Sequence, residues 1–262
     1  MILAIESSSS VCSVSLQTNS GNIIDRWTEG RAEHSKKLVP FIGELLEESS
    51  GSVENGLSSL QKVIISNGPG SYTGLRIAGS ALRGLLFNQK VEFWAASTLA
   101  SIACSVLQEQ KPFSGIADAS SQAKTLSQTK ASAQSAGAVI HSVIDARGGY
   151  SYYQPFALEE SGLRILAEPK RVANSTVINA LHSNDQSVLA GAGWVNFTKA
   201  PTSSIQLEME EKKQFFHARN LLTLVCLPSK IGLEIAMVDR LEPYYLGNNQ
   251  VNNTYIPISK ET

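Results

Sequence analysis

The stretch NGPGSYTGLRIAGSALRGLL occupies residues 67–86 and follows a short apolar run, Val63–Ile65. The apolar run predicts a buried strand. Two glycines and a proline at 68–70 end that strand and favour a tight turn, because glycine takes positive φ without steric cost. Ser71 or Thr73 can then cap a helix, since a hydroxyl accepts a hydrogen bond from a first-turn N–H. The stretch therefore predicts a strand, a turn and a helix in succession.

The helix expected after the turn has bulky apolar residues on one side and small residues over much of the rest. Packing distance between helices is set by the side chains between them, so a thin helix favours close approach by another helix. The apolar side is formed by Leu75, Ile77, Ala78, Leu82, Leu85 and Leu86, and the small residues are Gly74, Ala78, Gly79, Ala81 and Gly84.

A glycine-rich turn between a strand and a helix is also the outline of an anion site, where backbone N–H groups and the helix dipole face the loop. The turn is neither a Walker A motif, because no Lys-Ser/Thr follows the second glycine, nor a GxGxxG motif. Two interpretations stay open from the residues alone: a turn that serves only packing, or a loop that contacts a nucleotide or anion. The contacts in the second case would be Ser7, Ser8, Gly68, Gly70 and Ser71.

Composition limits the class of protein. The chain has 262 residues, of which 42% are hydrophobic, and its formal net charge is −1. This length suffices for a packed core in one large domain or two lobes, and the charge gives no sign of nucleic-acid or membrane binding. Three widely spaced cysteines argue against a disulfide framework or a zinc knuckle. With no basic leader and no membrane-length apolar run, we expect a soluble, cytoplasmic protein without membrane contact.

The hydrophobic pattern predicts three strands, a helix, and then alternating strands and helices, and a weaker version of this order follows. This is the order of the actin, sugar kinase and Hsp70 ATPase class (ASKHA). We therefore expect an α/β fold with two actin-like lobes, each a mixed sheet flanked by helices. The expected elements are strands at 1–6, 11–16, 23–28, 63–65, 91–96, 138–145, 150–158, 163–168 and 188–191, and helices at 33–49, 73–86, 97–107, 174–181 and 212–227.

The same pattern predicts the division of the chain. The first lobe is expected at 1–110, the second at 111–228, and a C-terminal segment at 229–262. Residues from about 119 to 137 are rich in Ala, Ser and Gln and carry almost no large apolar side chain. This insertion is expected to form an exposed helix or a flexible loop, because it has little apolar surface to offset the entropy of ordering.

Several motifs resemble those of the bacterial TsaB (YeaZ) family. GPGSYTGLRI at 68–77 is a long, gapless match, and ILAIESSSSVCSVSL at 2–16 is similar to the opening strand, turn and strand of the family. VIDAR at 143–147 resembles its second-lobe DAR element, AGW at 192–194 its GxGW turn, and LEPYYL at 241–246 its C-terminal PxYL segment. The resemblance covers most of the chain. In the family a glutamate usually stands three residues after the DAR arginine, whereas here that position is Tyr150.

The resemblance implies an accessory subunit of a tRNA-modifying complex, not a catalyst. Members of the family bind TsaD, a relative that holds the metal and the nucleotide. With TsaE and a threonylcarbamoyl-AMP synthase they form N6-threonylcarbamoyladenosine at position 37 of tRNAs reading codons that begin with A. We accordingly expect no tightly bound cofactor on this chain, ATP and a metal on the partner, and tRNA contact through the complex.

The family also implies where the partner binds. TsaD contacts the two helices of the first lobe, and a homodimer can form through the same surface. The expected interface residues are Leu38, Phe41 and Leu45 of the first helix and Ala78, Ala81, Leu82 and Leu85 of the glycine-rich helix.

The residues themselves also favour a chain without catalytic residues or metal ligands. A metal-dependent transferase of this fold needs two histidines on one helix face, and no two of His34, His141, His182 and His217 lie within one helical turn. Each histidine is expected to be a surface or singly bonded side chain. Glu6, at the end of the first strand, is either a polar strand end or a cation ligand. The alternative function is a kinase or ATPase of the same fold, with nucleotide between its lobes.

Asp145 and Arg147 in the DAR element leave two interpretations open. They can form a local ion pair, or they can contact a partner. No nucleophile and base are paired by spacing in a way that indicates a protease, although such groups need not be close in sequence.

Overall fold

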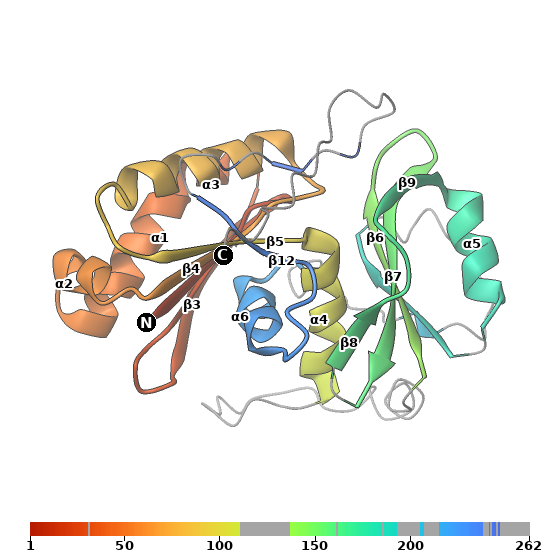
Figure 1. Ribbon diagram of the computed structural model, residues 1–262. Coiled ribbons are helices and arrows are strands. Elements are labelled where there is room, and N and C mark those ends of the chain that lie inside the picture. Colours follow the sequence, from red (N-terminus) through yellow and green to blue (C-terminus); the bar gives the residue numbers. More distant parts are fainter. Residues whose placement is uncertain are drawn as a thin grey trace, which may run out of the picture.

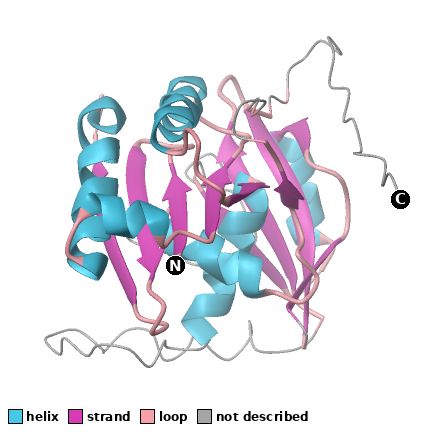
Figure 2. Cartoon of the chain, turned by 60° about the vertical axis from the view of Figure 1, so that its left-hand side comes forward, coloured by secondary structure: helices cyan, strands magenta, loops and turns pink. Residues whose placement is uncertain are grey.

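A computed structural model describes residues 1–30, 32–110, 137–160, 162–184, 186–192, 205–206 and 215–237, and the single positions 241, 243, 244 and 246. In this part of the chain two six-stranded sheets, each with its own helices, form two lobes (Figures 1 and 2). The predicted two-lobed α/β fold is confirmed. The predicted insertion, apart from Gly137, and the GW of the AGW motif lie outside the described residues.

The first sheet is mixed, with strand order β12-β5-β4-β1-β2-β3. The hairpin-linked strands β1, β2 and β3 are antiparallel, whereas β1, β4 and β5 are parallel. The near-continuous apolar runs of β1 and β4 fit strands that are covered on both faces. The strands are β1 (Ile2–Glu6), β2 (Val11–Gln17), β3 (Ile23–Glu29), β4 (Lys62–Ser66), β5 (Glu92–Ala96) and β12 (Leu233–Ile235).

Helices α1 (Glu33–Ser50) and α3 (Tyr72–Leu85) cover one face of this sheet (Figure 1). Leucines of both helices pack in one core cluster with alternate residues of β1, β2 and β4. A short helix, α2 (Val53–Ser58), stands where the sequence analysis predicted no helix or strand. It begins because the Ser52 side chain accepts a hydrogen bond from the Asn55 N–H, as an N-cap does.

The second sheet has the order β11-β10-β6-β7-β8, and β9 also pairs with β7. One face is covered by α5 (Asn174–His182), which packs Val177 and Leu181 against the sheet residues Val143 and Leu189. The strands are β6 (Val139–Asp145), β7 (Tyr150–Glu159), β8 (Gly162–Ile165), β9 (Lys170–Ala173), β10 (Ser187–Gly191) and β11 (Ile205–Gln206).

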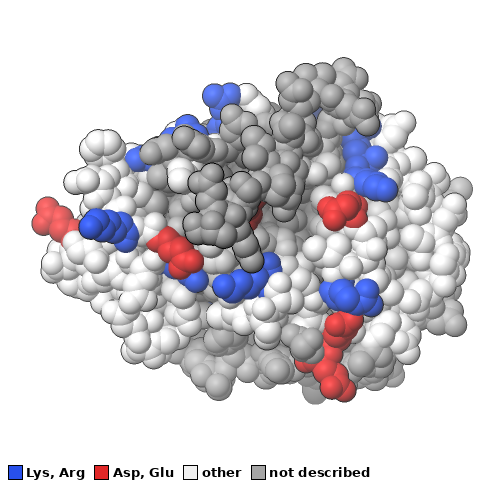
Figure 3. All heavy atoms as spheres, viewed as in Figure 1, with Lys and Arg blue, Asp and Glu red and all other residues white. Residues whose placement is uncertain are grey.

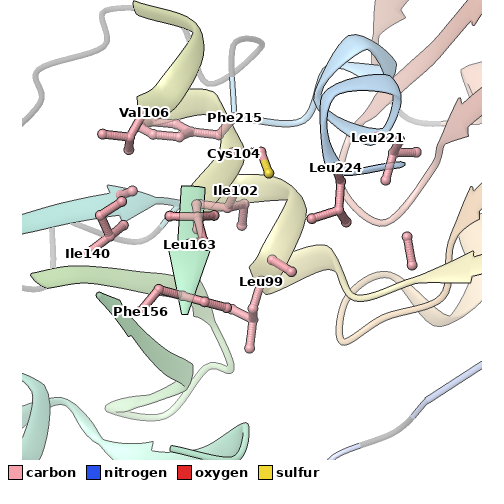
Figure 4. Packing of buried hydrophobic residues seen from close by; sticks show 14 of the residues in the cluster. Leu99, Ile102, Cys104, Val106, Ile140, Phe156, Leu163, Phe215, Leu221 and Leu224 are labelled. Carbon is pink, nitrogen blue, oxygen red and sulfur yellow. The ribbon is translucent and has the colours of Figure 1, made fainter. Parts of the chain in front are cut away.

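Two helices, α4 (Thr98–Gln110) and α6 (Ala218–Cys226), lie between the sheets (Figure 1). Their apolar side chains join residues of both sheets in one buried cluster, of which Figure 4 shows a part. The two lobes therefore share a core. The labelled members are Leu99, Ile102, Cys104 and Val106 of α4, Ile140, Phe156 and Leu163 of the second lobe, and Phe215, Leu221 and Leu224 in and before α6.

The described contacts place α6 with the first sheet, although the sequence predicted the second lobe to extend to residue 228. The Ala218 N–H donates to Ser13 Oγ of β2 at 3.0 Å. The Arg219 guanidinium donates twice to the Asp25 carboxylate of β3, at 2.6 and 2.8 Å. Strand β12 then pairs with β5. The chain thus returns to its first lobe before residue 228. Within the described residues, no helix is both long and apolar enough to cross a membrane.

Candidate functional site

The glycine-rich turn packs tightly against the chain's own backbone. A Cβ atom at Gly70 would lie under 3.0 Å from the carbonyl oxygen of Ser8, and one at Gly74 equally close to that of Ser7. A Cβ at Gly68 would meet the carbonyl oxygen of Tyr244 in the C-terminal segment. The three glycines therefore allow three pieces of backbone to meet, as the absence of a Cβ permits.

Hydrogen bonds join the same pieces of backbone. The Ser71 N–H donates to the Ser8 carbonyl at 2.6 Å, and the Tyr244 N–H donates to the Asn67 carbonyl at 2.7 Å. Ser71, not Thr73, caps α3, because its hydroxyl accepts from the Gly74 N–H at 3.2 Å. The Ser71 N–H and the first-turn Gly74 N–H, which an anion would use, are thus engaged within the protein.

The first-strand residues that were candidates for nucleotide contact are buried beneath this turn. Glu6, Ser7 and Ser8 are all buried. One oxygen of the Glu6 carboxyl accepts from the Ser8 N–H at 2.7 Å and from its hydroxyl at 2.5 Å. Burial raises the pKa of Glu6. No group of three or more His, Cys, Asp or Glu side chains in the described chain is arranged to hold a metal ion.

Four of the residues predicted to contact a partner lie in the core of the first lobe. Leu38, Leu45, Ala78 and Leu82 are buried against the sheet, so a partner cannot reach them in the folded lobe. The reason is the pattern of α3 itself: Ala78 and Leu82 are one turn apart, and this side of the helix covers β4 and β1.

The three other predicted interface residues, Phe41, Ala81 and Leu85, are only partly buried at the edge of the same cluster. On α3, Ile77 lies four residues before Ala81, so Ile77, Ala81 and Leu85 form one stripe. Large apolar side chains beside these helices are exposed, and Phe87, just after α3, is 81% exposed. We call this surface the α1–α3 face; it consists of Val39, Phe41, Ile77, Ala81, Leu85 and Phe87.

Two histidines, His141 and His217, make more contacts than the sequence predicted. His34 is singly bonded, as expected, through Nε2 to the Val11 carbonyl at 3.0 Å. His141 instead bonds on both ring nitrogens, to the Tyr153 hydroxyl at 2.8 Å and to Ser187 Oγ at 3.2 Å. Burial lowers the pKa of His141 to about 4. No sequence signal marks this group, because its partners stand on two other strands.

His217 is the second exception. Its Nδ1 accepts from the Arg219 N–H at 3.2 Å at the start of α6, and its Nε2 lies 3.2 Å from the Asp25 carboxylate. The pKa of His217 is lowered. Burial is the largest cause and the charge of Arg219 adds to it, whereas the nearby Asp25 carboxylate opposes it. The side chain therefore helps to hold α6 on β3.

The DAR element forms the hairpin between β6 and β7. Within it, the backbone N–H of Arg147 donates a hydrogen bond to the Asp145 carboxylate at 2.9 Å. Of the two interpretations left open, neither is decided, because Asp145 and Arg147 meet here through a backbone contact that closes the turn. The described residues show no ion pair between these two side chains.

Comparison with known proteins shows which proteins the chain is similar to. The chain is 24% identical over 251 residues to the tRNA threonylcarbamoyladenosine biosynthesis protein TsaB of Escherichia coli (strain K12), and the match covers 95% of each chain. This similarity over nearly the whole chain supports the resemblance to the TsaB (YeaZ) family. The protein of the same description from Buchnera aphidicola subsp. Acyrthosiphon pisum is 32% identical over 112 residues, 42% of this chain and 48% of that protein.

Two further comparisons concern the shared fold. YeaZ from Pseudomonas aeruginosa superposes with a TM-score of 0.70 at 24% identity and covers 94% of this chain and 99% of its own. Residues 28–152 match a family model described as TsaD, tRNA N6-adenosine threonylcarbamoyltransferase. That region contains α1, the glycine-rich turn, α3 and the DAR hairpin. The actin-like ATPase fold expected from the order of elements is thereby confirmed.

Proposed function

We propose that this chain is a non-catalytic subunit in the biosynthesis of N6-threonylcarbamoyladenosine in tRNA, and that it binds and stabilises a TsaD partner through the α1–α3 face. The proposal takes the pathway from the names of its relatives. In the proposed complex ATP and the metal belong to the partner, TsaE joins the assembly, and this chain binds no cofactor tightly.

The observation that carries the proposal is the exposed apolar surface of the α1–α3 face. Phe87 is 81% exposed and Val39 48%, in addition to the half-buried stripe of α3. Large apolar side chains left exposed near one another often mark an interaction site. The exposed side of α3 also carries Ser80 and Gly84, so a partner helix can approach its backbone closely.

The packing of the glycine-rich turn supports a binding role over a catalytic one. In a phosphate-binding loop, glycines let the backbone approach the ligand. Here the glycines at 68, 70 and 74 face carbonyl oxygens of the same chain. The alternative of a kinase or ATPase with its own site would require this turn to separate from Ser7 and Ser8.

Ala81→Arg tests the docking role. We expect this variant to bind the partner at least about 30-fold more weakly, the effect of losing a central interface contact. Ala81 is partly exposed on α3, so a long charged side chain can extend into solvent in the free chain. The thermal unfolding midpoint should stay close to that of the parent.

The matched control is Ala180→Arg, which changes a partly exposed alanine on α5 of the second lobe. It should bind TsaD as the parent does in a titration followed by calorimetry. Equal binding by the Ala81 variant, or an equal loss in both variants, would show that the α1–α3 face is not the docking surface.

Titration with MgATP separates the proposed subunit from the alternative enzyme. The isolated chain should give no saturable heat at micromolar concentration, whereas the complex with TsaD should bind. Tight binding by the chain alone would favour a kinase or ATPase.

A further inference from the structure

The tip of the β6–β7 hairpin is an exposed surface that the docking role does not use. Four consecutive residues, Arg147, Gly148, Gly149 and Tyr150, are exposed there. The first three take positive φ values of 59°, 64° and 80°, so the chain reverses in a compact left-handed turn. No atom lies within 4 Å of where a Cβ would stand at either glycine. The backbone at the tip is therefore open to close approach.

The hairpin tip is held in one arrangement by hydrogen bonds on both sides. The Arg147 N–H donates to the Asp145 carboxylate at 2.9 Å, and the Ala146 N–H donates to the Tyr150 carbonyl at 3.0 Å. The Gly149 carbonyl accepts from the Asn174 N–H at 2.9 Å at the start of α5. A tip fixed in this way loses little entropy when it binds a ligand.

An aromatic ring and a guanidinium are stacked beside the tip. The Arg171 guanidinium lies over the ring of Tyr150, with 3.9 Å between its carbon and the ring centroid. Tyr150 remains 40% exposed. A cation held against an aromatic face in this way leaves a flat, polarisable surface on which a base can stack.

The charge around the tip is more positive than that of the chain, whose net charge is −1. At the tip itself the cations Arg147 and Arg171 outnumber the one carboxylate, Asp145, which already accepts from a backbone N–H. None of the ion pairs among the described residues involves Arg147. Figure 3 shows basic side chains gathered over the part of the second lobe where Figure 1 labels β9, with an acidic one next to them.

We propose that this tip is a contact site for RNA: Tyr150 and Arg171 stack on an unpaired base, and Arg147 binds an adjacent phosphate. Single-stranded RNA is recognised by aromatic or guanidinium stacking combined with cations along the backbone, and both features are present here. An acidic protein surface would use the cations but would leave the exposed Tyr150 ring without a role. The proposal rests on the proposed function, since it gives this chain a direct contact with the tRNA of that pathway.

The test measures binding of fluorescently labelled bulk tRNA to the full chain by anisotropy at several salt concentrations. Tyr150→Ala should weaken binding about tenfold, because the loss of one stacked base costs about 1–3 kcal/mol, and should leave the salt dependence unchanged. Arg147→Ala should weaken binding and reduce the slope of log K against log[salt] by about one.

Arg164→Ala is the matched control. It removes an exposed arginine from β8 of the same lobe, which pairs with Glu159, and it should bind tRNA as the parent does. An equal loss in the control, no effect of Tyr150→Ala, competition by heparin as strong as that by tRNA, or no binding by the parent would each overturn the proposal.

The proposed TsaD docking and the proposed RNA contact can each be contradicted without the other. Variants at Tyr150 and Arg147 should bind TsaD normally, and Ala81→Arg should bind tRNA normally. A loss of TsaD binding in all three variants would instead indicate a general folding defect, and the unfolding midpoints of the variants would reveal it.

Discussion

Gly74→Ala is expected to destabilise the first lobe by about 3 kcal/mol or more, at the upper end of the usual cost of overpacking. The added Cβ would lie under 3.0 Å from the carbonyl oxygen of Ser7. That oxygen belongs to a rigid turn, because the Ser7 N–H donates to Ser66 Oγ and the next N–H donates to the Glu6 carboxyl. Urea unfolding followed by circular dichroism gives the free energy of unfolding directly.

Gly84→Ala is the matched control on the same helix. No atom lies within 4 Å of a Cβ at Gly84, so alanine should raise the free energy of unfolding by about 0.5–1 kcal/mol through its helix propensity. The opposite signs of the two changes are the critical result. If Gly74→Ala were as stable as the parent, the turn would have room to open, and the argument against a phosphate site would fail.

Acid is expected to destabilise the second lobe through His141. Burial lowers the pKa of this imidazole from 6.5 to about 4, so the native state keeps it neutral. Between those values the unfolded chain binds more protons than the native chain. Stability is therefore complete above pH 6.5 and is lost as the pH falls towards 4, by about 3 kcal/mol in all.

The measurement compares the parent with His141→Gln in urea unfolding at a series of pH values from 4 to 8. The variant should be less stable at pH 7, because the contacts with Tyr153 and Ser187 are altered, but its stability should fall less below pH 6.5. His182→Gln, which removes an exposed imidazole on α5, is the control that leaves the buried group in place. Parallel pH profiles for the parent and His141→Gln would contradict the assigned cause.

Burial of Glu6 has the opposite effect on how stability depends on pH. Its pKa is raised, so its contribution to stability is present at low pH and is lost as the pH rises through the native pKa. The difference between the parent and His141→Gln isolates the histidine, because Glu6 is the same in both.

The sequence by itself determined the strands and helices with strong local signals. The apolar runs of β1 and β4 and the glycine-rich turn before α3 each depend on residues that are neighbours in the chain. Weak or short elements were missed for the same reason: α2 has six residues and β12 has three, and neither is long enough to show a period.

Only the tertiary structure decided which side of α3 faces the sheet, where α6 belongs, and what surrounds the buried histidines. Small residues lie on both sides of α3, so the pattern could not separate the core residues Ala78 and Leu82 from the partly exposed Ala81. Contacts such as Arg219 with Asp25, 194 residues apart, leave no trace in local periodicity. They arise when the two sheets bury α4 and α6 between them, because burial of apolar surface depends on the whole fold and not on any one segment.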